Sequence, residues 1–532
     1  MRRRAVPDLV EISMKLQTHR LLILVCVVLV FTCQPLSAEK HRLRATCRKE
    51  ARLSPELVLV RRAKSRFMGV CRDGSSVYEV PDDQKQALRS MASSVDGVIP
   101  RDEVRSTRLL ISYPNQNDKP SNETLQAAGL NLIQDYQNGS FLIVEPQGDV
   151  TAGTVEALMA DDAVAHVAPD YIMSIPTIEA AGEVVPSTTS SGPNDPFLGK
   201  LWGMKNSGAT QVWPRTHESP NIIVAVIDSG VDYRHPDLKD NMWSRDGRHG
   251  YDFYDNDDDP LDEENHGTHV AGTIAGTGNN GVGVVGVTWK AQIMALRFLG
   301  PDGSGATSDA VKCIDWAVDN GAHILCNSWG GPQTSPELAR AVARAESKGV
   351  LFVAAAGNTG GSGNNNDSRP SYPASLQQLN VISVGAIDES DARGSFSHYG
   401  KMSVDIGAPG VQILSTTRNN QYDTYSGTSM AAPHVAGAAA LVWASTFTTP
   451  SQNPTQMMKV RDLICENARP VTALSNFWGH AAPAKVPGGV LDISFLARTP
   501  PNDTPSVPEV PRSRLAENRM VVAPARLRAI IQ

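Results

Sequence analysis

Between residues 194 and 496, short segments that are almost wholly apolar alternate with segments whose apolar residues repeat at helical spacing. The strand candidates lie at 222–227, 293–299, 324–328, 350–355 and 381–384, with helical patterns at 308–320 and 336–348 between them. Strands that are apolar along their whole length are buried on both faces, which is typical of a parallel sheet covered by helices. The sequence therefore predicts an α/β domain over residues 194–496, with a parallel β-sheet flanked by helices.

Residues 105–177 have a different texture. Strand candidates at 109–113, 131–136, 140–145 and 164–167 alternate with helical stretches at 123–128 and 154–160. Asn138-Gly139, between the second and third of these strands, is a strong hairpin signal. The order βαββαβ predicts a small α+β domain of ferredoxin-like type in front of the larger one.

The N-terminus has the pattern of a secretory signal peptide. Residues 21–33 are almost continuously apolar, Lys15 and Arg20 precede them, and Pro35-Leu36-Ser37-Ala38 offers a cleavage site. We therefore expect residues 1–38 to be a signal peptide that sends the protein into the secretory pathway, with Met14 as an alternative start. An uncleaved membrane anchor is the competing interpretation, but the apolar run is short for a membrane span.

Three further segments lack regular apolar periodicity. Residues 39–104 are polar and basic, and we expect a poorly structured lead-in. Residues 178–193 are rich in Ser, Thr, Pro and Gly, which is typical of an exposed, cleavable linker. Residues 497–532 are rich in proline and are expected to form a flexible tail.

Composition narrows the function classes. The formal net charge of −7 argues against a nucleic-acid partner, which usually requires a basic face. The chain has seven cysteines but no C-x-x-C pair, which argues against a structural zinc site. Cys313 and Cys326 either form a disulfide or remain buried thiols. N-glycosylation sequons, expected to lie at the surface in a eukaryotic secretory pathway, occur at Asn122, Asn138, Asn366 and Asn502.

Three segments carry residues suited to catalysis. Asp228 ends an apolar strand, where parallel-sheet proteins place their sites, although such an Asp is often only a turn or cap residue. His266 is surrounded by small residues at the start of a helical pattern; paired with His269 it is also a weak zinc candidate, but the Glu of H-E-x-x-H is missing. Ser429 opens a long apolar helix, either as a cap or as a nucleophile aided by the helix N-terminus.

Read jointly, the blocks at 224–230, 265–272 and 427–437 resemble the signature segments of the subtilisin-like serine proteases, the subtilases. The chain order Asp, His, Ser is the one this family uses. The resemblance implies a subtilisin-like catalytic domain and a serine endopeptidase that cuts protein or peptide substrates through an acyl-enzyme. Ser429 would attack the carbonyl, His266 would move the proton, and Asp228 would hold the imidazole.

The same resemblance assigns further site residues. Asn358, at the end of Val353-Ala354-Ala355-Ala356-Gly357-Asn358, would donate its side-chain amide to the oxyanion beside the backbone N–H of Ser429. Ser328, Trp329 and Gly330 would pair with an extended peptide, although a purely structural role competes for the tryptophan. Ser371 would form the base of the primary specificity pocket.

Structural calcium is expected at two places. Asp252 and Asp257 lie in an acidic run that resembles a calcium loop of thermitase-like subtilases; a solvated acidic loop is the alternative. A second set resembles another calcium site of the family: Asp195, Asp237, the side chain of Asn280, and the backbone carbonyls of Thr277, Val282 and Val284.

The resemblance extends to the segment in front. Residues 105–177 would be an inhibitory propeptide, the intramolecular inhibitor of a self-processing zymogen, cut between Met173 and Asn194. We expect a secreted, monomeric enzyme. A lipase or esterase is a rival, but its nucleophile normally lies in G-x-S-x-G, and Ala431 replaces the last Gly. A catalytically dead binding protein is another rival, although such proteins usually lose a catalytic residue.

Overall fold

The computed structural model describes residues 40–46, 66–70, 75–81, 99–100, 108–148, 152–180, 192–480 and 486–498. The chain divides into two compact units, Met1–Ala497 and Arg498–Gln532, and of the second unit only Arg498 is described. The expected signal peptide and nearly all of the expected tail therefore lie outside the described residues, as does most of the linker expected at 178–193.

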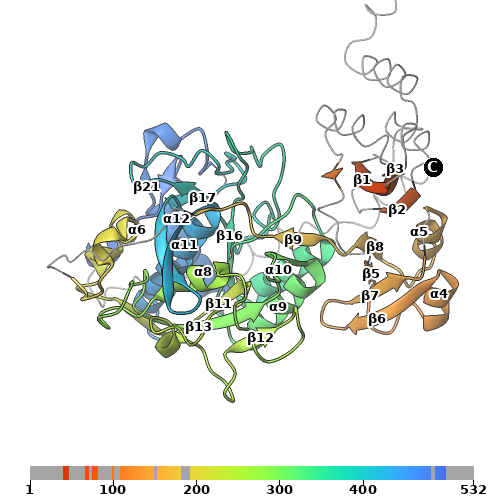
Figure 1. Cartoon of the computed structure of the whole chain (residues 1–532), viewed down its shortest axis with the longest axis horizontal. Helices are drawn as coiled ribbons and strands as arrows, with labels where there is room; N and C mark the ends of the chain where they lie inside the picture. The colour runs from red at the N-terminus through yellow and green to blue at the C-terminus, as the bar shows by residue number, and fades with distance from the viewer. Residues whose placement is uncertain are drawn as a thin grey trace, which may run out of the picture. The chain divides into compact units, whose positions relative to one another are not determined.

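A nine-stranded sheet forms the centre of the larger domain (Figure 1). Neighbouring strands run parallel except for the last pair, so the predicted fold class is confirmed. The strands are, in spatial order, β12 (Gly250–Asp252), β13 (Lys290–Arg297), β11 (Glu218–Asp228), β15 (Ile324–Asn327), β16 (Leu351–Ala355), β17 (Val381–Ile387), β18 (Ile406–Pro409), β22 (Gly489–Val490) and β21 (Arg469–Pro470).

Helices cover the two faces of this sheet. The remaining elements of the domain are α6 (Trp202–Asn206), α7 (Ala209–Val212), α8 (His266–Ala275), β14 (Ser304–Ala306), α9 (Thr307–Asp319), α10 (Pro336–Lys348), β19 (Ile413–Thr417), β20 (Gln421–Ser426), α11 (Thr428–Thr446), α12 (Pro454–Glu466) and α13 (Phe495–Arg498). Side chains alternate along β11, because Val224 and Val226 join the apolar cluster around α11, whereas Ala225 and Ile227 join the cluster around α9 and α10.

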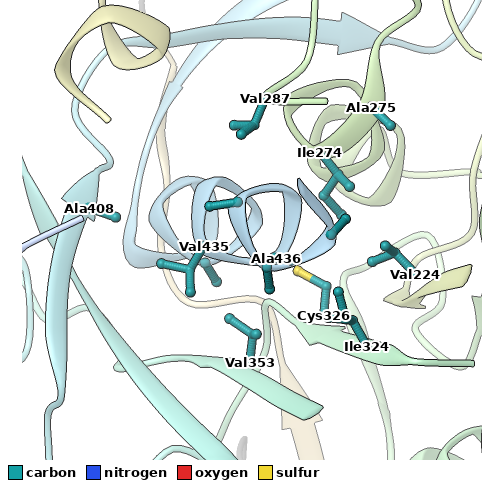
Figure 2. Packing of buried hydrophobic residues seen from close by; sticks show 14 of the residues in the cluster. Val224, Ile274, Ala275, Val287, Ile324, Cys326, Val353, Ala408, Val435 and Ala436 are labelled. Atoms are coloured by element: carbon teal, nitrogen blue, oxygen red, sulfur yellow. The ribbon is translucent and has the colours of Figure 1, made fainter. Parts of the chain in front are cut away.

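Helix α11 lies within the core. Its residues from Thr428 to Trp443 are all buried, and most of them are small. Figure 2 shows Val435 and Ala436 of this helix among Val224, Cys326 and Val353 of the sheet. Small side chains let the helix approach the strands and α8 closely. The start of α11 is thereby held rigidly at the edge of the sheet where the strands end.

The segment in front of the sheet contains four strands and two helices. Its elements are β5 (Leu109–Ser112), α4 (Asn122–Ala127), β6 (Leu130–Tyr136), β7 (Phe141–Pro146), α5 (Ala152–Met159) and β8 (His166–Pro169), and they form an antiparallel sheet of order β6-β7-β5-β8. The expected hairpin joins β6 and β7, with Tyr136 opposite Phe141. Leu110, Phe141 and Ile143 belong to the same buried cluster as α9 and α10 of the larger domain.

The lead-in contains strands that the sequence analysis did not predict. They are β1 (Lys40–Thr46), β2 (Arg66–Val70), β3 (Ser75–Pro81) and β4 (Ile99–Pro100), which form a sheet of order β2-β3-β1-β4. The expectation of a poorly structured segment is therefore wrong for these residues. β1 and β3 contain no continuous apolar run, and β2 and β4 have five and two residues, so their partners across the sheet define these strands.

The cysteines of the described residues are buried free thiols. Cys326 belongs to the cluster around α11 and Cys313 to the cluster around α9, so the sheet separates their side chains. A disulfide between them is therefore not formed. The surface position expected for the sequon at Asn366 is also wrong, because Asn366 is buried and its Nδ2 donates to the carbonyl of Ala356 at 2.9 Å. Asn122 and Asn138 are exposed as expected.

The described helices include none that is both long and apolar enough to span a bilayer.

Candidate active site

Asp228 and His266 meet at the carboxyl end of the sheet. Asp228 is the last residue of β11, and His266 is the first residue of α8. Their side chains are fully buried, and His266 Nδ1 lies 2.8 Å from Asp228 Oδ1. Gly267 makes this approach possible, because a Cβ there would lie 2.0 Å from the carbonyl oxygen of Gly230. The strand end and the helix start are thus in direct backbone contact.

Acidic neighbours raise the pKa of the His266 imidazole. Burial lowers the pKa of His266, but the carboxylates of Asp228 and Glu264 raise it, and the result is a pKa above the ordinary value. Glu264 also accepts a hydrogen bond from the backbone N–H of His266 at 2.8 Å. His266 Nε2 has no hydrogen-bond partner among the described residues, so it is free to take a proton.

Ser429 lies in the first turn of α11. It is fully buried, and its Oγ donates to the carbonyl of Ser328 at 3.1 Å. Ser328 Oγ donates in return to the carbonyl of Ser429 at 2.9 Å. A hydrogen bond between Ser429 and His266 is absent from the described contacts; such bonds often form only when a reacting group is bound.

Asn358 follows β16 and is oriented by the residue next to Ser429. Its Oδ1 accepts from the backbone N–H of Thr428 at 3.0 Å and from Thr428 Oγ1 at 2.8 Å. With the oxygen fixed in this way, the amide nitrogen faces the site, where Nδ2 donates to the carbonyl of Thr177 at 2.9 Å. Asn358 Nδ2 is therefore positioned to donate a hydrogen bond to a carbonyl oxygen on which negative charge develops.

A segment from the end of the small domain crosses the site. It comprises β9 (Ile172–Ser174) and β10 (Glu179–Ala180), which pair antiparallel with β14 and β20 respectively. Ser174 also forms an antiparallel bridge with Gly330. A cavity of about 680 Å³ lies beside this segment, lined among others by Gly357, Asn358 and Ser371.

The expected substrate-binding residues lie in different surroundings: some contact the crossing segment or line the cavity, and one lies in the core. Gly330 pairs with the crossing segment, and Ser371 lines the cavity. Trp329 is fully buried against Phe298, with ring centroids 4.9 Å apart, so its contacts are those of a core residue. His398, which the sequence analysis missed, also lines the cavity and hydrogen-bonds Thr359 Oγ1 at 2.5 Å. Nothing in its sequence surroundings marks it.

One expected calcium set comes together. Asp237 is fully buried, and burial raises its pKa to about 6, with a further contribution from the charge of Asp195. Asn280 Nδ2 donates to Asp237 at 2.8 Å, and the backbone of Asn280 donates to Asp195 at 3.4 Å. No described residue donates to the remaining expected ligands, the carbonyl oxygens of Thr277, Val282 and Val284.

Carboxylate and carbonyl oxygens are the kind of donors that Ca²⁺ prefers, and Asp195 and Asp237 supply two buried carboxylates. The described residues contain no group of three or more His, Cys, Asp or Glu side chains arranged for a metal, and this set has only two carboxylates. A calcium ion at this place would need carbonyl oxygens of the Asn280 loop in addition to the two carboxylates, because Asn280 Oδ1 accepts from the N–H of Val282 at 2.8 Å.

The other expected calcium residues are arranged differently. Asp252 is buried and its carboxylate pairs with Arg297 at 2.8 Å. Asp257 exchanges backbone hydrogen bonds with Asp252, and its own carboxylate accepts from the N–H of Asp259 at 2.9 Å. Because a guanidinium already compensates the buried charge, this loop suits a cation less well than the set around Asp237.

The second histidine of the zinc hypothesis has a different role. His269 Nε2 lies 3.0 Å from the carbonyl of Ile413 and 3.2 Å from that of Asp423, so it serves as a donor to both. Burial lowers the pKa of His269 to about 3, which keeps the ring neutral. Asp262, another member of the acidic run, accepts hydrogen bonds from Ser229 Oγ and Thr268 Oγ1 and so connects the first turn of α8 to the residue after β11.

Comparison with known proteins gives concordant matches. The family model described as the subtilase family matches residues 219–481. The chain is 42% identical over 337 residues to a thermophilic serine proteinase of Bacillus sp. (strain AK1), covering 63% of this chain and 77% of that protein. It is 41% identical over 251 residues to thermitase of Thermoactinomyces vulgaris, covering 47% of this chain and 85% of thermitase.

A solved structure matches as well. Fervidolysin from Fervidobacterium pennivorans, described as a keratinolytic enzyme related to subtilisin, aligns with a TM-score of 0.60 and 26% identity. The match covers 74% of this chain and 61% of fervidolysin.

Proposed function

The chain belongs to the subtilase family of subtilisin-type serine proteases, and from that premise we propose that it is a secreted endopeptidase made as a self-processing zymogen. Asp228, His266 and Ser429 would be its catalytic triad, and Asn358 the oxyanion donor. The observation that carries this assignment is the hydrogen bond from Asn358 Nδ2 to the peptide carbonyl of Thr177, made while Asn358 Oδ1 is held by Thr428, the residue before Ser429.

The proposed mechanism follows from the contacts of these residues. Ser429 Oγ attacks a peptide carbonyl as its proton passes to His266 Nε2, the nitrogen without a partner. Asp228 holds Nδ1 and stabilises the imidazolium that forms. The negative charge that develops on the carbonyl oxygen meets Asn358 Nδ2 and the N-terminus of α11.

The small domain would act as the inhibitory propeptide, residues 105–177. Asp170 supports this role, because its carboxylate accepts from the backbone N–H of Ser308 at 2.9 Å and from Ser308 Oγ at 2.7 Å and so caps the start of α9. Tyr136 donates to Asp315 of the same helix at 3.0 Å. These contacts hold the domain next to the cleft while β9 and β10 fill it.

Calcium bound by Asp195, Asp237, Asn280 and the nearby carbonyls would be structural. It would neutralise two buried carboxylates and tie the loop around Asn280 to the body of the domain. No step of the proposed reaction requires it.

A fluorophosphonate probe tests the proposed function. The processed protein is expected to be labelled on Ser429 and to lose peptide hydrolysis in proportion to labelling. Ser429→Ala should be neither labelled nor active, whereas Ser415→Ala, a buried serine of β19 whose Oγ donates to the His269 carbonyl, should retain labelling. Undiminished peptide hydrolysis by Ser429→Ala would refute the assignment.

A further inference from the structure

The crossing segment is held on both sides of Ser429. On one side, Ser174 exchanges two backbone hydrogen bonds with Gly330, at 3.1 and 2.9 Å, and Ile175 N–H donates to the Gly303 carbonyl at 2.9 Å. On the other side, Glu179 pairs with Ser426, the end of the strand that leads into α11. The chain opposite Ser429 must therefore be supplied by residues 175–178.

Within these residues, one carbonyl meets the candidate oxyanion donor. Asn358 Nδ2 donates to the carbonyl oxygen of Thr177 at 2.9 Å. The amide cannot turn away without losing both bonds from Thr428 to its oxygen. The peptide bond that follows this carbonyl is the one between Thr177 and Ile178.

The next residue lies against the start of α11. A Cβ placed on Gly427 would be 3.3 Å from Ile178 Cγ2 and 3.1 Å from Asn358 Nδ2, so both side chains lie against Gly427, two residues before the nucleophile. Ile178 is half-buried and packs against the main core cluster. Among the described residues, Asn358 Nδ2 donates to the carbonyl of Thr177 and not to that of Pro176 or Ile178, and Glu179 already belongs to β10.

We propose that the precursor first cuts itself between Thr177 and Ile178, an inference that rests on the proposed function. Ser429 Oγ adds to the Thr177 carbonyl carbon, and its proton passes to His266. The bond from that carbon to the Ile178 nitrogen breaks, and the proton moves from His266 to the new amine. Water then hydrolyses the ester, which leaves a carboxylate on Thr177 and restores the hydroxyl.

The first test is to identify the new chain ends in a time course of processing of the full precursor. The earliest product is expected to have Ile178 as its N-terminus, and the earliest released fragment to end at Thr177. The Ser429→Ala precursor should stay intact over the same period. An earliest N-terminus at Thr177 or at any residue other than Ile178, in a protein that still hydrolyses added peptide, overturns the bond assignment and leaves the proposed function standing.

Two proline variants sharpen the test. Ile178→Pro removes the amide N–H of the leaving group and restricts the backbone at the bond, so it should abolish the first cut. Val184→Pro, in the same linker, is the matched control and should be processed at the wild-type rate. Each variant is also melted in the Ser429→Ala form to show that it folds. Equal processing of both variants overturns the proposal, whereas a wild-type precursor that cuts neither itself nor added peptide overturns the proposed function as well.

Discussion

Replacing Arg297 by methionine is expected to lower the free energy of unfolding by about 3–5 kcal/mol. The guanidinium is buried and pairs with Asp252 at 2.8 Å, Asp255 at 3.1 Å and Glu263 at 2.7 Å. The side chains of Asp255 and Glu263 are 53% and 49% exposed, so water replaces the lost partner and each of these pairs contributes at most about 1 kcal/mol. Asp252 is 1% exposed and would be left as a buried, unpaired charge. The size of the loss is therefore set by Asp252.

The measurement is thermal unfolding of the Ser429→Ala protein, in which self-digestion should not interfere. At roughly 2 °C per kcal/mol for a domain of this size, Arg297→Met should lower Tm by about 6–10 °C. The loss should be smaller at pH 5 than at pH 8, because burial raises the pKa of Asp252 and the unpaired carboxyl then takes up a proton. Glu263→Gln is the matched control and should cost less than about 1 kcal/mol.

A double substitution isolates the buried pair. Adding Asp252→Asn to Arg297→Met removes the unpaired charge and should recover most of the lost stability. The reasoning is refuted if Arg297→Met costs less than Glu263→Gln, or if Asp252→Asn recovers nothing in the Arg297→Met background.

Three further predictions concern ligands and pH. Binding at a calcium concentration of about 100 Kd stabilises the folded state by about 2.7 kcal/mol, so chelation of calcium should lower Tm by roughly 5 °C. Asp237→Asn should abolish this difference, and an equal response of the variant to chelation would contradict the assigned site. Glu264→Gln should move the acid limb of the kcat/KM profile to lower pH, because the Glu264 carboxylate helps to raise the pKa of His266; a limb that stays or moves upward would count against that coupling. Burial raises the pKa of Asp170 to about 7, so its stabilising contribution is complete below about pH 4 and lost as the pH rises to 7. The melting temperature of the Ser429→Ala precursor should therefore fall more between pH 5 and pH 7 than that of the same precursor with Asp170→Asn, and parallel curves would refute this.

The fold of the larger domain was largely predictable because its central strands are apolar along their length. The expected segment at 324–328 corresponds to β15, and the pattern at 336–348 corresponds to α10 with the same ends. The shortest strands at the two ends of the sheet were not predictable. β12 has three residues and β21 has two, and both depend on neighbouring strands for their definition.

The positions of the candidate site residues within their helices and strands were predictable. Asp228 ends β11, His266 begins α8 and Ser429 lies in the first turn of α11, so the sequence blocks and the structural positions coincide. Contacts between distant segments could not be predicted. The pairing of Asp252 with Arg297 and the burial of Asn366 depend on residues that no local pattern connects.

The peptide that occupies the cleft belongs to the same chain as the cleft, which has a consequence for competition. A tethered segment is present at a fixed effective concentration, of order mM for a short linker, however dilute the protein is. A free peptide at micromolar concentration therefore competes poorly as long as the backbone is continuous. Once that backbone is severed, the segment can dissociate from the cleft, and the fraction of clefts that it occupies then depends on the protein concentration.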